Sequence, residues 1–447
     1  MPASPPQVEV KTTTRRPSLP DVFSSVRVST SPQMWRRALG FVGPGFIIAV
    51  GYMDPGNWAT DLAAGSRYGY TLLFAIMVSN LLAILMQILA VKLGVAAEMD
   101  LAQACREHYS KPVNFGLYIF AEIAIAACDL AEVIGSAIAL QLLFGIPLLV
   151  GVLITSLDVL LILLLQNHGF RYFESVIMVL IATIGILFGI EILFSHPDWG
   201  AITFNLFVPS RELVTNGDML YIAIGILGAT VMPHNLYLHS SIVQTRDYPR
   251  TPKGKREAIW LAGLDSTVAL TLALFVNAAI LIVAAAVFHR SGHNEVAEIG
   301  DAYKLLTPLL GVAGASTMFA VALLASGQNS TLTGTLAGQV VMEGFLEIRL
   351  PPWQRRMITR ILAIIPTVIV TAIWGMSGTA RLLILSQVIL SMQLSFAVFP
   401  LVAFTNDRRK MGEFVNRPWL RILAWASAIL IAVLNAWLLV QICLGHS

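Results

Sequence analysis

The sequence predicts an all-α polytopic membrane protein with eleven transmembrane helices, of which the first and sixth are discontinuous. The composition is the first reason, because 56% of the 447 residues are hydrophobic and only 12% are charged, against about 25% charged residues in a soluble domain. The second reason is a series of apolar runs of about 20 residues, the length that crosses a bilayer. The third is a pair of proline-containing tetrads, each inside an apolar stretch.

Nine apolar runs are long enough to span the membrane without interruption. They lie near residues 70–97, 113–141, 146–166, 174–195, 257–288, 313–337, 357–375, 380–404 and 420–443. Two further segments, near 40–65 and 218–245, reach that length only by running through the tetrads Asp54-Pro55-Gly56-Asn57 and Met232-Pro233-His234-Asn235. Proline breaks a helix, and in lipid the freed backbone groups must face a ligand or a cavity.

Residues 1–38 are rich in Pro, Ser, Thr and Arg and lack the apolar core of a signal peptide. We expect a disordered cytosolic tail, followed by one transmembrane transporter domain over residues 39–447. Most of the 29 Lys and Arg residues fall in loops on the side of this tail. The positive-inside rule therefore places the N-terminus in the cytoplasm and, with an odd number of spans, the C-terminus outside. The net charge of +3 is too small to suggest a nucleic-acid partner.

The two tetrads are five spans apart. Because five is odd, the second half enters the membrane from the opposite side, which predicts inverted repeats over about 39–200 and 218–404 and an extra helix over about 420–443. Paired breaks of this kind mark a transport site near the bilayer midplane.

Asp54 is the strongest candidate site residue, because a carboxylate inside the membrane is costly unless it is paired, solvated or bound to a cation. A structural alternative is an N-cap for the helix that resumes after it. Asn57 and the backbone carbonyls of Gly51 and Ala229 offer further oxygen ligands. Met232, if it is not a packing residue, adds a thioether, which favours the softer ions Mn²⁺, Fe²⁺, Co²⁺ or Cd²⁺ over Mg²⁺ or Ca²⁺.

The third span carries three acids, Glu122, Asp129 and Glu132, which helical geometry places on one arc that must face the bundle interior. The candidate partners of these acids are His234, Arg246, Arg355 and Arg356. Two interpretations stay open: a static lattice of ion pairs that fixes the helices, or a proton path. Gln387 and Gln87 are polar residues that could also reach the centre.

At this point the chain resembles the Nramp family of divalent metal transporters. The resemblance rests on the segments Gly51–Asn57 (GYMDPGN), Asp129–Glu132 (DLAE), Ala229–Ser240 (ATVMPHNLYLHS), Leu324–Gly334 (LASGQNSTLTG) and Ser386–Leu390 (SQVIL). It implies a LeuT-like fold of ten core spans plus one, and transport of Mn²⁺ or Fe²⁺ with protons. It also implies that Gln387 joins the metal ligands in some conformations, and that the proton-linked network contains Glu122, Asp129, Glu132, His234, Arg246 and Arg356 together with Asp54.

We therefore expect a proton-coupled Mn²⁺ or Fe²⁺ importer that works by alternating access, as a monomer in a bacterial inner membrane. It should have no enzymatic activity and no cofactor other than its cargo. The alternatives are a Mg²⁺ transporter of the Nramp-related type, against which Met232 argues, and a membrane-embedded metal sensor that does not transport. No protease or hydrolase motif is present.

Overall fold

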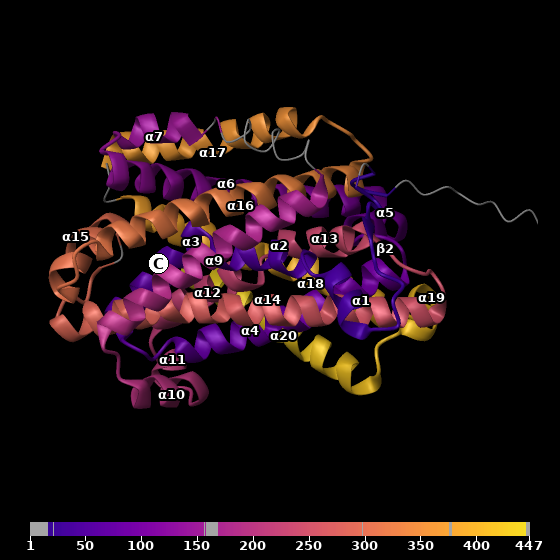
Figure 1. Cartoon of the computed structure of the whole chain (residues 1–447), viewed down its shortest axis with the longest axis horizontal. Coiled ribbons are helices and arrows are strands. Elements are labelled where there is room, and N and C mark those ends of the chain that lie inside the picture. The colour runs from indigo at the N-terminus through magenta and orange to yellow at the C-terminus, as the bar shows by residue number, and fades with distance from the viewer. Residues whose placement is uncertain are drawn as a thin grey trace, which may run out of the picture.

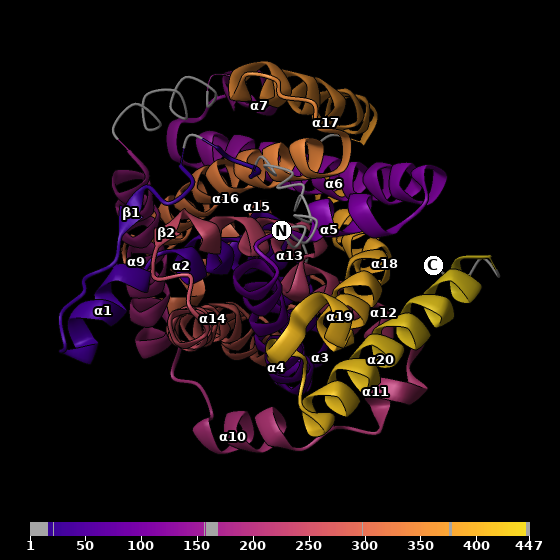
Figure 2. The same cartoon turned by 90° about the vertical axis from the view of Figure 1, so that its right-hand side faces the viewer.

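The computed structural model describes residues 17–20, 22–155, 157, 169–296, 298–374 and 378–443. Helices form nearly all of this part, and they run lengthwise in one bundle (Figure 1). The two strands in it, β1 (Val26–Arg27) and β2 (Arg246–Asp247), form a short parallel pair. Viewed along the bundle, α7 and α17 lie on one side and α10 on another, around a centre that contains α2, α3 and α13 (Figure 2).

Seven stretches of helix in the described residues are long and apolar enough to cross a membrane. They are α4 (Leu73–Ala96), α6 (Lys111–Phe144), α9 (Phe170–Ser195), the α12–α13 segment (Gly217–Thr245), α14 (Pro252–Val287), α18 (Thr379–Asn406) and α20 (Pro418–Cys443). Four more helical segments match the remaining predicted spans. These are α2 with α3, α7 (Leu148–Thr155), α16 (Ala315–Leu346) and α17 (Pro352–Trp374). Only the first part of the predicted span 146–166, up to residue 155, and residue 157 are among the described residues.

Both proline tetrads break their helices as predicted. The first span consists of α2 (Pro44–Val50), the 3₁₀ turn η1 (Gly51–Met53) and α3 (Pro55–Tyr68). The sixth consists of α12 (Gly217–Val231) and α13 (Pro233–Ile242). Proline occupies the first position of α3 and of α13, where its missing N–H costs no hydrogen bond. The prediction of discontinuous first and sixth helices is therefore confirmed.

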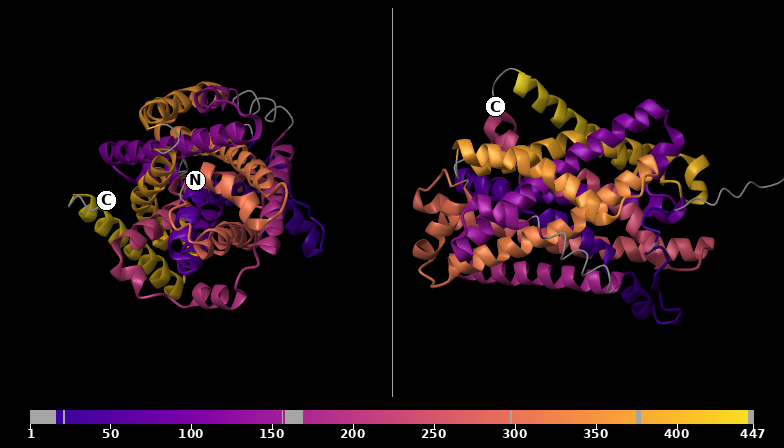
Figure 3. Two further views of the ribbon diagram at one scale, coloured as in Figure 1. Left: turned by 90° about the vertical axis from the view of Figure 1, so that its left-hand side faces the viewer. Right: turned by 90° about the horizontal axis from the view of Figure 1, so that it is seen from above.

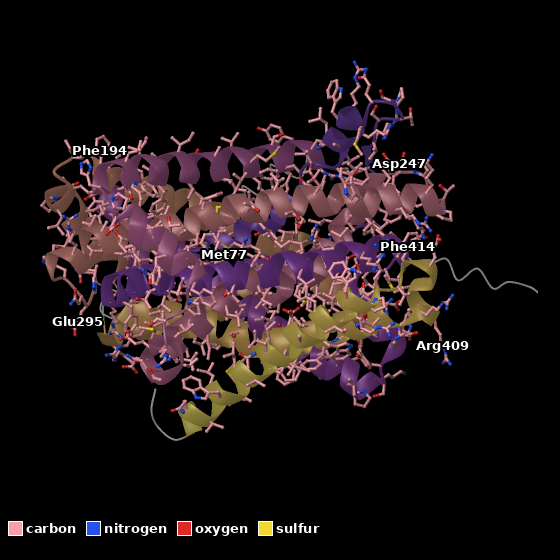
Figure 4. The ribbon with its side chains drawn as sticks, turned by 90° about the horizontal axis from the view of Figure 1, so that it is seen from below. Met77, Phe194, Asp247, Glu295, Arg409 and Phe414 are labelled. Atoms are coloured by element: carbon pink, nitrogen blue, oxygen red, sulfur yellow. The ribbon has the colours of Figure 1, made fainter. Side chains whose placement is uncertain are left out.

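Short elements close the two ends of the bundle. They are α1 (Met34–Phe41), α5 (Leu101–His108), α10 (Trp199–Phe207), α11 (Glu212–Thr215), η2 (Val243–Thr245), η3 (His289–Ser291), α15 (Ile299–Leu310), α19 (Arg408–Met411) and η5 (Gly412–Phe414). Asp247, Arg409 and Phe414 lie at one end, and Phe194 and Glu295 at the other (Figure 4). We call these the β-strand end and the α15 end. The loops that contain Asp247 and Arg409, both of which carry basic residues, thus lie at the same end.

The broken helices lie in the most buried part of the molecule. Every residue of α13 is buried, and so is nearly all of α2. The outer helices differ, because large apolar side chains such as Val179 and Leu193 of α9 and Ile422 of α20 are exposed. Figure 3 shows α9 and α20 at the periphery of the bundle. Exposed apolar side chains along such helices are expected where lipid is the solvent.

The described part of the predicted tail is packed on the bundle. Ser18 Oγ donates a hydrogen bond to Asp100 Oδ2 at 2.6 Å, and Leu19 N donates to Glu343 Oε2 at 3.1 Å. Ser24 N donates to the Gln244 carbonyl, next to the β1–β2 pair. The prediction of a disordered tail does not hold for these residues, because backbone pairing with β2 and buried polar contacts fix them. The predicted repeat boundaries stay predictions.

Candidate metal centre

Asp54 lies at the break of the first span, between η1 and α3, and is fully buried. Its extended backbone makes it the N-cap of α3, and Oδ1 accepts a hydrogen bond from Asn57 N at 2.9 Å. Asp54 therefore does cap α3 through Oδ1, as the structural alternative predicts. This cap accounts for only one oxygen, because Oδ2 is buried and has no hydrogen-bond partner among the described residues. That second oxygen is available to a cation.

Three predicted oxygen ligands converge on one point. Asn57 Nδ2 lies 2.7 Å from Asp54 Oδ1, 3.2 Å from the Gly51 carbonyl oxygen and 3.1 Å from the Ala229 carbonyl oxygen. The first two oxygens come from the first broken helix and the third from the sixth. Both carbonyls are left free by the helix breaks, which is why they can face inward. The amide NH₂ thus occupies a position that is surrounded by oxygen atoms suited to a cation.

The sulfur of Met232 lies at the same place. Met232 is fully buried at the break between α12 and α13, with φ of 35°, a backbone region that β-carbon-bearing residues rarely adopt. A Cβ added to Gly51 would lie 2.7 Å from Met232 Sδ and 2.3 Å from Asn235 Nδ2. The glycine therefore lets the two breaks approach closely enough to place a thioether beside the oxygens. Asn235 Nδ2 also donates to the Ile48 carbonyl of α2.

Gln387 of α18 borders this centre. A Cβ at Gly56 would overlap the Gln387 side chain, so the two residues are in contact. Gln387 Nε2 donates to Ser386 Oγ at 3.0 Å, and Oε1 has no hydrogen-bond partner among the described residues. The predicted ligands from three helical segments are thus brought together, with Gln387 at the edge.

All three acids of the third span lie in α6, and two of them, Asp129 and Glu132, face α16. Glu132 accepts hydrogen bonds from Ser330 Oγ at 2.9 Å and from Thr331 Oγ1 at 3.2 Å. Asp129 faces the same part of α16, since a Cβ at Gly334 would lie 2.9 Å from Glu132 Oε1 and 3.6 Å from Asp129 Oδ1. His234, one residue after Met232, is buried and interacts electrostatically with Asp129. The acids and the histidine therefore form a polar group adjoining the metal centre.

Glu122 lies nearer the N-terminus of α6 than the other two acids, and it is paired with Arg355. Arg355 Nη2 donates to both carboxylate oxygens, at 3.0 and 3.1 Å. For Glu122, this pair agrees with the interpretation that the third-span acids form static ion pairs that fix the helices. The side chain of Arg356, the other predicted partner from α17, lies outside the described residues.

Arg246 does not join the third-span acids. Its Nη2 lies 2.7 Å from Glu174 Oε1 of α9 and donates to the Val42 carbonyl at 2.9 Å. Asp265 of α14 accepts from Gly45 N at 2.7 Å at the same helix start. The predicted pairing of Arg246 was wrong, because η2 and β2 carry this residue to the N-terminus of α2, on the other side of the broken helices. Arg246 thus binds at the N-terminal end of α2, the first half of the first span.

Several residues of this region had no predicted role. Ser330 and Thr331, which donate hydrogen bonds to Glu132, lie in a polar stretch of α16. Polar residues inside a predicted span were the sequence feature that could have indicated a functional role for them. Asn277 of α14 donates from Nδ2 to Asn57 Oδ1 at 3.4 Å. His239 Nδ1 lies 3.0 Å from Gln87 Oε1, whose amide donates to Tyr52 Oη. Only the folded chain shows which span each of these residues meets.

The ligand set has low charge. The described residues contain no cluster of three or more His, Cys, Asp or Glu side chains that could hold a metal ion. The centre instead combines one carboxylate, an amide, two carbonyls and a thioether. One carboxylate supplies only half of the charge of a divalent ion, so an ion bound here would be held more weakly than in a structural site, as suits an ion that must leave. The fold and the site thus define a multi-pass membrane protein whose centre suits a transported divalent cation.

Comparison with known proteins agrees with this class. Residues 45–441 match the model of the Nramp family, described as natural resistance-associated macrophage protein-like. The chain belongs to the Nramp family, whose members are metal transporters and not enzymes. It is 63% identical over 426 residues to the divalent metal cation transporter MntH of Nostoc, covering 95% of this chain and 96% of the relative. The MntH of Bradyrhizobium diazoefficiens is 61% identical over 428 residues, which are 96% and 95% of the two chains.

Solved structures show the same fold. A manganese transporter of Eremococcus coleocola superposes with a TM-score of 0.88 at 42% identity, covering 94% of this chain and 90% of that one. Mhp1, a nucleobase-cation-symport-1 family transporter, superposes with a TM-score of 0.60 at 13% identity and covers 89% of this chain and 92% of its own. This second likeness concerns the fold alone, and the predicted LeuT-like fold is confirmed.

Proposed function

We propose that this chain imports Mn²⁺ across a bacterial inner membrane together with protons, by alternating access. The observation that carries the proposal is the convergence of Asp54 Oδ1 and the carbonyl oxygens of Gly51 and Ala229 within 3.2 Å of one atom, Asn57 Nδ2. Met232 supplies the soft ligand beside them. The transporters to which the chain is similar are named for divalent metal cations and for manganese.

The choice of metal rests on Met232. A thioether is a poor ligand for Mg²⁺ and Ca²⁺ and an acceptable one for Mn²⁺ and Fe²⁺. Fe²⁺ is therefore the second expected substrate, and the Mg²⁺ alternative is disfavoured. Each half of a broken helix can tilt about the break, so the centre can open first to one side and then to the other.

Proton movement is assigned to the group that adjoins the centre. Asp54, His234, Asp129 and Glu132 offer titratable side chains in series, while Ser330 and Thr331 hold Glu132 in place. Glu122 with Arg355 and Arg356 would continue the path. Arg246 is left out of this path, because it is bound to Glu174. We expect a monomer with the β-strand end in the cytoplasm and the C-terminus outside.

The test is Mn²⁺ uptake into proteoliposomes with simultaneous measurement of the lumenal pH. The unmodified protein should take up Mn²⁺ and acidify the lumen, and Asp54→Asn should lose at least about 90% of the uptake. Asp301→Asn, which changes an exposed carboxylate in α15, is the matched control and should leave uptake unchanged. Uptake that survives Asp54→Asn contradicts the metal centre, and uptake without acidification contradicts the proton part. Absence of counterflow in the unmodified protein would favour a sensor.

A further inference from the structure

Asp61 is a buried carboxylate that the proposed function does not use. It lies in α3, is 1% exposed, and neither of its carboxylate oxygens has a hydrogen-bond partner among the described residues. The charged side chain that interacts with it electrostatically is Asp54, which has the same sign. Glu174, by contrast, is a buried carboxylate that is paired with Arg246. An ionised carboxylate at this depth is costly unless it takes up a proton or a cation reaches it.

The position of Asp61 on α3 relates it to the metal centre. Residues seven apart in an α-helix differ by about 20° around the axis and lie about 10.5 Å apart along it. Asp54, Asp61 and Tyr68 therefore follow one face of α3, and Asn57 lies close to the same line. Tyr68 lines a pocket of about 660 Å³ at the α15 end, together with Asp198. Asp61 is thus halfway between this pocket and Asp54, on the side predicted to face outside.

Acceptor oxygens without hydrogen-bond partners among the described residues also lie at the metal centre, toward which the face of α3 that carries Asp61 leads. Asn277 of α14 donates its Nδ2 to Asn57 Oδ1, and its own Oδ1 is buried without a hydrogen-bond partner among the described residues. Asp54 Oδ2 is likewise buried without a hydrogen-bond partner among the described residues. A region with free carboxylate and amide oxygens suits a cation, since an anion or a neutral polar ligand would need donors.

We propose that Asp61 is a second divalent-cation site, which holds the ion on the outer side of the metal centre before it reaches Asp54. The proposal rests on the proposed function and names a further site on its path. One carboxylate with retained waters binds a divalent ion more weakly than Asp54 with four neighbouring ligands, so the ion moves inward. Glu191 of α9 is also buried without hydrogen bonds among the described residues, but its helix contributes no ligand to the metal centre.

The test is titration of the purified full chain with Mn²⁺, followed by electron paramagnetic resonance, which separates the sharp signal of free Mn²⁺ from bound ion. The unmodified protein should show a tight and a weaker class of bound Mn²⁺. Asp61→Asn should remove the weaker class and change the affinity of the tight class by less than about tenfold, because a helical rise of about 10.5 Å separates the two positions. Asp61→Glu should keep both classes, since the charge remains.

Two further variants make the outcome decisive. Asp54→Asn should remove the tight class and keep the weaker one. Asp218→Asn, which alters an exposed acid at the start of α12, should keep both. A single class in the unmodified protein, both classes in Asp61→Asn, or loss of the weaker class in Asp218→Asn would overturn the proposal. A tight class that survives Asp54→Asn would instead contradict the proposed function, while the assignment of Asp61 would still be decided by its own variants.

Discussion

Asn57 Nδ2 donates a hydrogen bond to the carbonyl oxygen of Ala229 at 3.1 Å, and this contact joins the two broken helices at the metal centre. The same nitrogen binds Asp54 Oδ1 and the Gly51 carbonyl. A cation that enters must displace or rotate this amide, which would turn its oxygen toward the ion. Under the proposed function, binding of the ion and the relative position of the two helices would therefore be linked through the side chain of Asn57.

Met232→Ala should change the choice of metal more than the ability to bind. Loss of the thioether should weaken Mn²⁺ binding by about tenfold, equal to about 1.4 kcal/mol, and leave the weak binding of Mg²⁺ unchanged. Calorimetric titration with both ions measures this. Met219→Ala, which shortens a buried methionine within α12, is the control. Equal losses for Mn²⁺ and Mg²⁺ would show that Met232 acts through packing.

Gly51→Ala should abolish Mn²⁺ binding although it removes no ligand atom. The new methyl group would lie 2.7 Å from Met232 Sδ and 2.3 Å from Asn235 Nδ2, so the two helix breaks must separate. Gly116→Ala in α6 is a matched control, since nothing lies within 4 Å of the added Cβ. Titration with Mn²⁺ measures the affinity of both variants. A normal affinity in Gly51→Ala would mean that the close approach of the two helix breaks is not required for binding.

Glu132→Gln should separate metal binding from proton movement. The amide keeps the size of the side chain and still accepts from Ser330 Oγ, but it does not titrate. We expect Mn²⁺ affinity within about threefold of the unmodified protein and acidification of the proteoliposome lumen reduced by about tenfold. Unreduced acidification would exclude Glu132 from the proton path and favour a purely structural role.

Arg246→Ala should destabilise the protein. Both side chains of the Arg246–Glu174 pair are fully buried, and removal of one partner of a buried pair costs about 3–5 kcal/mol. Arg256→Ala breaks an exposed pair with Glu413, whose side chains are 67% and 41% exposed, and should cost less than about 1 kcal/mol. Thermal unfolding in detergent compares the two. A stable Arg246→Ala protein that binds Mn²⁺ but moves no protons would restore the proton-path role.

Asp100 should make stability depend on pH. This residue precedes α5, outside the spans, and burial raises its pKa from 3.8 to about 6, although the hydrogen bond from Ser18 opposes the shift. The folded chain therefore retains a proton that the unfolded chain releases, and stability falls as the pH rises from about 4 to 6, by up to about 3 kcal/mol. Unfolding temperatures at pH 4.5 and 7 should show this loss in the unmodified protein and a smaller one in Asp100→Asn. Equal losses in both would contradict it.

The sequence by itself determined the membrane class, the two helix breaks and the ligand types. Apolar length, proline position and a carboxylate in an apolar stretch are local properties, so Asp54, Asn57 and Met232 could be selected without a structure. The resemblance of the motifs to the Nramp family then fixed the fold, which the structural neighbours confirm.

Tertiary structure decided which distant groups meet. Arg246 and Arg355 looked equivalent as partners for the acids of α6, yet only Arg355 reaches one of them, and Arg246 is held by Glu174 at the start of α2. The N-terminal residues from Ser18 onward looked mobile by composition, yet Asp100 and β2 fix them. Asp265 accepts hydrogen bonds from Gly43 N and Gly45 N of the first span, whereas Asp61 has no hydrogen-bond partner among the described residues. Pairing of buried charges depends on contacts between segments far apart in the chain, and local sequence carries no record of those contacts.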